Sequence, residues 1–232
     1  MSFLTWENLV VGHKEKEPLN FPFSGRICDP GIYAVSGQNG CGKSTLMKTW
    51  LNLAKPLKGS IFLHDRPFPK SRDIFQGVTY VPQFLSVNKF FHITVKDFVR
   101  QGYGPNYRPS KAYEKQISQA LEEWQLAGYE DKSFHELSGG QRTRVLIARA
   151  ILSKPRILFL DEPLASLDSC CQFQLITTLQ IMTERDQVCV IVVDHHLQRF
   201  KNYISASIVF SREHDKEIST IHFERNKDDN PF

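Results

Sequence analysis

The sequence lacks the features that mark a membrane-spanning or exported chain. No window approaches about 18 consecutive uncharged apolar residues, the length that crosses a bilayer. The first ten residues, MSFLTWENLV, contain no basic stretch followed by a long apolar one, as a secretory signal would. We therefore expect a chain without a membrane span or signal peptide, so that any work on a membrane passes through a partner.

The sequence also lacks cysteines at the spacing of a metal site, and it has no blocks of like charge. The five cysteines are an odd number without metal-ligand spacing: Cys28, Cys41, Cys170, Cys171 and Cys189. Such usage is typical of reduced thiols in a cytosolic protein. The net charge of +4 is spread along 232 residues, which suits a phosphate ligand and does not indicate a nucleic-acid partner. With 41% hydrophobic and 23% charged residues, the composition is that of a globular protein and argues against disorder or a fibrous repeat.

Short apolar runs rich in β-branched residues predict the strands. They lie at Ile32–Ser36, Ser60–His64, Val78–Val81, Ile157–Leu160 and Val188–Val193. Most are apolar throughout, a pattern typical of a parallel sheet covered on both faces. Helical stretches such as Ser44–Leu53 and Cys171–Glu184 alternate with them, and Ser205–Phe210 with Ile218–Phe223 predict a hairpin. The pattern predicts an α/β core.

A central segment, from about Phe84 to Ala148, contains helical patterns without strong strand candidates. Pro109-Ser110 is a typical helix start. Four large side chains then recur at helical spacing, which predicts one buried face: Tyr113, Ile117, Leu121 and Trp124. The segment is therefore expected to form an inserted helical subdomain.

A glycine-rich segment, GQNGCGKS at Gly37–Ser44, joins a predicted strand to a predicted helix. It satisfies G-x-x-x-x-G-K-[ST] in the context which that pattern requires. Glycines let backbone N–H groups face phosphate oxygens, and the helix N-terminus favours an anion. Lys43 supplies charge near the β- and γ-phosphates, Ser44 can bind Mg²⁺, and Thr45 is available for a phosphate contact. The alternative is a glycine-rich turn, and the motif alone leaves kinases, GTPases and motor ATPases open.

Two adjacent carboxylates end the predicted strand in ILFLDEP, Ile157–Pro163. Asp161 can complete the shell of Mg²⁺, which prefers few carboxylates together with phosphate oxygens and water. Glu162 is then available to orient, or accept a proton from, the water that attacks the γ-phosphorus. The alternative is that Asp-Glu-Pro only terminates a strand.

The segment LSGGQ, Leu137–Gln141, precedes the helical sequence RTRVLIARA. Ser138, Gly139 and Gly140 offer a hydroxyl and backbone donors where a helix begins, and this predicts a second phosphate-binding surface. Taken alone, the segment could equally be an ordinary helix N-cap. LSGGQ upstream of a strand ending in Asp-Glu-Pro resembles the signature of the ATP-binding cassette (ABC) family, and the resemblance extends from Leu4 to about Phe210.

This resemblance implies an α/β fold: a P-loop NTPase (RecA-like) core, an N-terminal antiparallel β portion and an inserted helical subdomain. Residues 1–232 would form a single cassette, with 1–83 and 149–232 as the nucleotide-binding core and 84–148 as the subdomain carrying the signature. It also implies a head-to-tail homodimer, in which the signature of one copy covers ATP held by the P-loop of the other. A two-fold arrangement makes the two contacts equivalent.

The family's site residues carry over by motif. Those implied to bind ATP are His13, Gly37, Asn39, Gly40, Cys41, Gly42, Lys43, Ser44, Thr45, Ser138, Gly139, Gly140, Gln141 and Asp168. Those implied to bind Mg²⁺ are Ser44, Gln83 and Asp161, and the catalytic ones are Glu162, His195, Gln83 and Lys43. Gln83 in YVPQ matches the Q-loop, and Ser166-Leu167-Asp168 resembles the D-loop at the dimer interface.

Three positions depart from the family pattern. His195 is assigned as the switch histidine, although Asp194 stands before it where Thr is usual and His196 after it where Asp is usual. His196 is therefore a rival for that role. His13 stands where a Tyr commonly stacks on adenine, and an imidazole offers less stacking area.

The stretch from Phe84 to Pro105 bears on the partner, because transporter cassettes of this family use it as a socket for a permease helix. FFHITVKDFVRQGYGP resembles cassettes of metal-cation and metal-chelate importers, but His92 replaces their Pro and no Arg follows Gly102. We therefore expect a cytoplasmic, membrane-peripheral subunit that drives a permease for import of a zinc, manganese or iron cation or of a metal chelate. A separate solute-binding protein would serve it, and nucleic acid is not an expected partner. The alternative is a soluble cassette of iron–sulfur cluster assembly.

Overall fold

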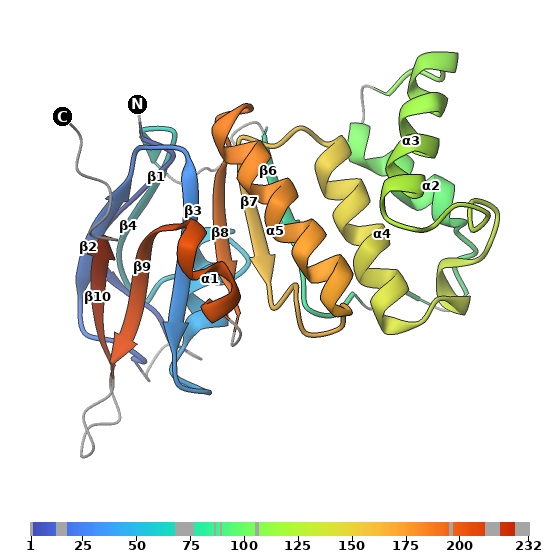
Figure 1. The fold of residues 1–232 in the computed structure, drawn as a ribbon. Coiled ribbons are helices and arrows are strands. Elements are labelled where there is room, and N and C mark those ends of the chain that lie inside the picture. The colour runs from blue at the N-terminus through green and yellow to red at the C-terminus, as the bar shows by residue number, and fades with distance from the viewer. Residues whose placement is uncertain are drawn as a thin grey trace. The chain divides into compact units, whose positions relative to one another are not determined.

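The computed structural model describes residues 2–12, 18–67, 77–85, 87–88, 90–104, 107–194, 197–211 and 219–225. Its contacts divide the chain into two compact units, residues 1–76 with 179–232 and residues 77–178. The division falls within helix α5, Ser169–Glu184. Figure 1 labels the elements of both units.

The first unit contains an antiparallel sheet in the order β2-β1-β4-β5. These strands are β1 Leu4–Val10, β2 Phe23–Ile27, β4 Lys58–Leu63 and β5 Arg66–Pro67. Trp6 of β1 is buried and its ring lies 5.1 Å from that of Trp50, the last residue of helix α1, Lys43–Trp50. Burying two indole rings removes a large apolar area from water, so this pair anchors the helix that follows the phosphate loop.

The same unit contains a second group of strands, in the order β10-β9-β3-β8. Their bounds are β3 Gly31–Gly37, β8 Cys189–Val193, β9 Ile204–Ser211 and β10 Thr220–Arg225, and the 3-10 segment η4, Leu197–Tyr203, precedes β9. β3 is parallel to both β8 and β9, whereas β10 is antiparallel to β9. All five residues of β8 are buried, as expected for an apolar strand within a parallel sheet.

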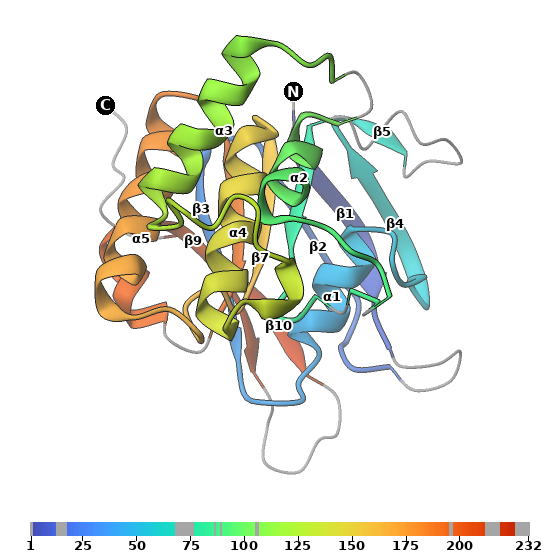
Figure 2. The same cartoon turned by 90° about the vertical axis from the view of Figure 1, so that its right-hand side faces the viewer.

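The second unit pairs β6, Val78–Val81, in parallel with β7, Ile157–Asp161. Between them the regular elements are helical: α2 Val95–Arg100, η2 Gln101–Tyr103, α3 Lys111–Glu123, η3 Phe134–Glu136 and α4 Gly139–Leu152. α2 and α3 both contact α4 (Figure 2). Phe98 of α2 stacks on Phe134 with ring centroids 4.5 Å apart, and Arg149 of α4 lies over the Phe98 ring.

The predicted fold class is confirmed: an α/β fold with an antiparallel N-terminal portion and a helical insertion. Ser110 caps α3 as expected, and Ile117, Leu121 and Trp124 are buried. Tyr113 is half-buried and packs against two other tyrosines. The strand expected at Ser60–His64 belongs to the antiparallel sheet instead of a parallel one, because its backbone pairs with β1. The division predicted at residues 84 and 148 stays a prediction.

Candidate nucleotide-binding segments

The phosphate loop lies in the first unit, between the end of β3 at Gly37 and the start of α1 at Lys43. Gly42 caps the helix with a φ of +109°, a conformation that side chains rarely adopt. A Cβ on Gly37 would approach the Phe210 Cβ to 2.7 Å, which is closer than real Cβ contacts. The tight path of this loop therefore depends on glycine at both positions.

Lys43 is buried beneath this loop, with 7% of its surface exposed. Its Nζ donates to the carbonyl oxygens of Gly37 and Gln38, each at 2.9 Å. These bonds compensate the burial of the ammonium group and hold a positive charge within the loop. Of the other predicted phosphate ligands, Cys41 and Thr45 are buried, Ser44 is half-exposed, and Asn39 and Gly40 are exposed. The loop is thus a glycine cradle with a built-in cation, as phosphate binding requires.

The two strand-end carboxylates lie in the second unit. Asp161 is buried at the end of β7, and the Tyr80 hydroxyl donates to its Oδ2 at 3.3 Å. Burial and the neighbouring Asp161 carboxylate both raise the pKa of Tyr80, so this hydroxyl keeps its proton. No sequence motif pointed to Tyr80. The feature that could have identified Tyr80 is its position three residues before Gln83. Tyr80 lies in strand β6, which pairs with the strand that ends at Asp161.

Glu162 adopts a φ of +48°, an uncommon backbone conformation for a residue with a side chain. Gln83 lies beside it, and its Nε2 donates to Glu162 Oε2 at 2.5 Å. Strained residues persist only where the surroundings hold them, and they cluster at functional sites. The structure thus brings together the two side chains that the sequence assigned to water activation and to the Q-loop.

The signature segment begins helix α4 with a capping box. Ser138 Oγ accepts from Gln141 N–H at 3.3 Å, while Gln141 Oε1 accepts from Ser138 N–H at 2.9 Å. The Gln141 amide also donates to the Tyr129 hydroxyl at 3.1 Å. Ser138 and Gly139 are exposed, and a Cβ on Gly139 would have no neighbour within 4 Å. The segment therefore presents an open helix N-terminus, with Gln141 engaged in holding it.

Asp168, the predicted D-loop residue, is exposed and accepts from the Cys171 N–H at 2.9 Å. That backbone hydrogen bond lowers the pKa of Asp168. The bond satisfies a donor in the first turn of α5, so within this chain Asp168 acts as a helix cap. His13, His195 and His196 lie outside the described residues, so their predicted roles stay predictions.

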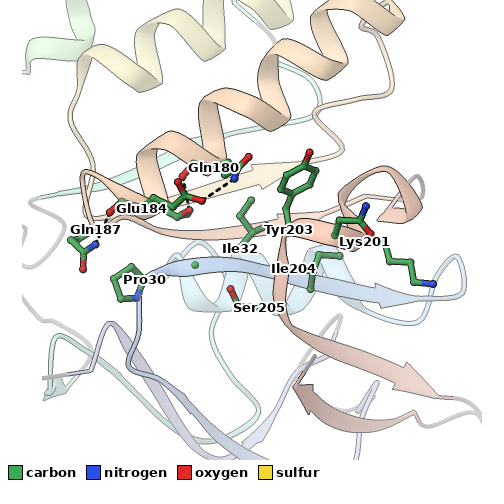
Figure 3. Close-up of a pocket in the computed structure, with 12 residues that line it drawn as sticks. Pro30, Ile32, Gln180, Glu184, Gln187, Lys201, Tyr203, Ile204 and Ser205 are labelled. Atoms are coloured by element: carbon green, nitrogen blue, oxygen red, sulfur yellow. Dashed lines mark hydrogen bonds between the residues drawn. The ribbon is translucent and has the colours of Figure 1, made fainter. Parts of the chain in front are cut away.

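An open pocket of about 670 Å³ lies elsewhere in the first unit (Figure 3). It is lined by residues at the start of β3, such as Pro30 and Ile32, and by Tyr203 and Ile204 where η4 meets β9. On α5, Gln180 donates to Glu184 at 2.8 Å beside it. The phosphate loop follows the opposite, carboxyl end of β3, so this pocket contains none of the predicted site residues.

Within the described ranges, no cluster of three or more His, Cys, Asp and Glu residues could hold a metal ion. No helix in the described part of the chain is both long and apolar enough to cross a membrane.

The family model described as ABC transporter matches residues 23–165. The chain therefore belongs to the ABC transporter family, as the motifs indicated. Within that family it is an ATP-binding subunit, and it is an ATPase.

Individual relatives agree with this assignment. The zinc transport system ATP-binding protein TroB of Treponema pallidum is 33% identical, over 88% of this chain and 77% of TroB. The manganese transport system ATP-binding protein MntB of Listeria monocytogenes is 31% identical, over 89% of this chain and 85% of MntB. Relatives named for molybdate and thiamine import are 31% and 29% identical. Among solved structures, cbiO1 of Clostridium perfringens, part of the transporter complex cbiONQ, has 26% identity and a TM-score of 0.77 over 97% of this chain and 88% of its own.

Proposed function

We propose that this chain is the ATP-hydrolysing subunit of a metal importer, in which two copies close head-to-tail over ATP and drive a separate membrane permease. The chain would lie at the cytoplasmic face of the membrane, and a separate solute-binding protein would deliver the metal. The observation that carries the catalytic part is the strained Glu162 held against Gln83 by a 2.5 Å hydrogen bond.

Each nucleotide-binding residue has a distinct task in this proposal. Lys43 and the loop N–H groups from Gly37 to Thr45 bind the β- and γ-phosphates. Glu162 orients the attacking water and accepts its proton, and Gln83 sets the direction of the Glu162 carboxylate through their hydrogen bond. His195 steadies the γ-phosphate, and His13 stacks on adenine. These assignments follow the family's motifs.

The donor set fits Mg²⁺, which prefers oxygen ligands and keeps several waters. A serine hydroxyl, an amide oxygen and a buried carboxylate would hold it, supplied by Ser44, Gln83 and Asp161. The ion, when bound, neutralises charge on the phosphate oxygens. The Tyr80 hydroxyl would keep the Asp161 carboxylate in one orientation.

The dimer is supported by the open signature segment. Ser138 and Gly139 are exposed at the start of α4, and nothing lies within 4 Å of the position that a Cβ on Gly139 would take. A helix N-terminus attracts an anion. The γ-phosphate of ATP bound to a second copy supplies such an anion, and Asp168 of the D-loop would lie at the same interface.

The permease is supported by an exposed aromatic group after the Q-loop. Phe84, Phe90 and Phe91 are 83%, 91% and 65% exposed. These three exposed aromatic side chains lie close together in the sequence and offer apolar surface that another protein could cover. In the family this stretch receives a permease helix, and an apolar helix would suit it.

The choice of metal rests on relatives named for zinc and manganese transport, together with the sequence around Phe90–Gly102. A deletion of the gene should reduce cellular uptake of labelled zinc, manganese or iron, with recovery on expression of the wild-type chain but not of Glu162→Gln. Unchanged uptake of all three metals would contradict the importer. Loss of iron–sulfur enzyme activity in its place would favour the soluble alternative.

A further inference from the structure

The D-loop residue Ser166 makes two contacts with the start of helix α4. Its Oγ lies 2.6 Å from Thr143 Oγ1. Its carbonyl oxygen lies so close to Gly140 that a Cβ there would approach it to 2.6 Å. The first contact joins two hydroxyl groups, and the second is possible only because Gly140 has no side chain. Ser166 therefore contacts the signature helix at two points.

The direction of the hydroxyl bond follows from the neighbouring carbonyl. Thr143 Oγ1 also lies 3.2 Å from the Gly139 carbonyl oxygen, to which it donates. A carbonyl oxygen can only accept, so both contacts are satisfied together when Thr143 donates to Gly139 and accepts from Ser166. The bonds therefore run from Ser166 through Thr143 to the backbone of Gly139, a residue of the exposed signature surface.

The D-loop is also tied to Glu162. The Ala165 N–H donates to the Glu162 carbonyl at 3.3 Å. The Gln172 amide donates to the carbonyls of Leu164 and Leu167, each at 2.9 Å. These hydrogen bonds hold the segment from Glu162 to Leu167 in one conformation, and Ser166 joins this segment to the signature helix.

We propose that Thr143 and Ser166 are positioning residues that couple the signature surface to the loop carrying Glu162, so that engagement of the partner's nucleotide aligns the general base. This inference rests on the head-to-tail dimer proposed above. Neither residue touches the reacting atoms. Each acts through a neighbour: Thr143 through Gly139, and Ser166 through the loop that begins at Glu162.

The test is a double-mutant cycle with Thr143→Val and Ser166→Ala. Each change removes the bond between the two hydroxyls and should lower kcat roughly two- to tenfold, the range for one neutral hydrogen bond. Thr143→Val also loses the bond to Gly139, for which the control below corrects. The KM for ATP should change little, because the phosphate loop is intact. The double variant should be no slower than the slower single variant, because both lose the same bond. Thr143→Ser, which keeps the hydroxyl, should restore the wild-type kcat.

Thr177→Val is the matched control. Thr177 is exposed on α5, and its hydroxyl donates to the Phe173 carbonyl four residues back, as Thr143 does to Gly139. It should hydrolyse ATP at the wild-type rate. Glu162→Gln is expected to trap the dimer. Adding Thr143→Val to it should raise the ATP concentration needed for dimerisation by the same factor, roughly two- to tenfold.

Multiplicative losses in the double variant, or no rescue by Thr143→Ser, would overturn the coupling. If Thr143→Val folds poorly, the cycle uses Thr143→Ala, and the same non-additivity decides. A wild-type chain that hydrolyses ATP as a monomer would instead overturn the head-to-tail dimer, so the two failures are distinguishable.

Discussion

The phosphate loop and the signature segment both lead glycines into a helix, yet their surroundings differ. Gly42 has a left-handed backbone and a crowded neighbourhood, and Lys43 is buried with its charge held by carbonyls. Gly139 has an ordinary backbone conformation and nothing near its missing Cβ. The first segment is a crowded loop that holds a cation, which suits enclosing a phosphate, whereas the second is open, which suits an anion presented by another molecule.

Gly139→Glu should break the second segment without harming the fold. A carboxylate in the first turn of α4 stabilises a helix by roughly 0.3–1 kcal/mol, but it repels a γ-phosphate. ATP hydrolysis should fall more than about tenfold, the effect of 1.4 kcal/mol, while ATP binding by the monomer stays unchanged. Steady-state kinetics and equilibrium binding of a fluorescent ATP analogue measure both. Hydrolysis at the wild-type rate would show that the signature does not meet phosphate.

Gly42→Ala should break the first segment by straining it. The φ of +109° and a Cβ 3.2 Å from the Leu19 side chain disfavour alanine, at a cost of about 1–3 kcal/mol in the free energy of unfolding. Urea denaturation measures this cost. Gly139→Ala is the matched control, because the same change at an open helical position should cost nothing or add slight stability. Equal stability of the two variants would contradict the contrast between the segments.

Asp168→Ala should have the smallest effect on the stability of the chain, because within the chain it removes only the cap of α5. The Cys171 N–H holds the pKa of Asp168 below its usual range, so the carboxylate stabilises the fold above its unfolded pKa of about 3.9. That stability is lost as the pH falls through the lower, folded pKa. The variant should therefore have a lower urea midpoint than the wild type at pH 7, and the gap should narrow in acid. If the difference in urea midpoint between variant and wild type widens in acid, the Asp168 carboxylate does not stabilise the fold as a helix cap.

Much of this contrast could be predicted from sequence. The strand before Gly37, the helix after it and the strand ending at Asp161 follow from local apolar runs, and all three are confirmed. Phosphate binding leaves a local pattern because the loop is contiguous. The N-terminal antiparallel portion, by contrast, was expected only from family resemblance, because β1 pairs with β4, more than forty residues away.

Contacts between distant segments escaped sequence reasoning for the same reason. Tyr80 meets Asp161 only because β6 and β7 pair in one register, and no local pattern fixes that register. The bond between Thr143 and Ser166 likewise joins a helix to a loop twenty-three positions along the chain. Gln141, expected at the nucleotide, is engaged within its own chain by Ser138 and Tyr129. Its predicted contact with ATP stays a prediction.

We propose that ATP bound by one copy is covered by the signature of another and hydrolysed with Glu162 as the base. Light scattering after size exclusion of Glu162→Gln, with and without ATP and Mg²⁺, tests this most directly. We expect a monomer without nucleotide, a stable dimer retaining two ATP molecules with it, and hydrolysis reduced by roughly 10²–10⁴-fold. A variant that remains monomeric with ATP bound, or that turns over at the wild-type rate, would contradict the claim.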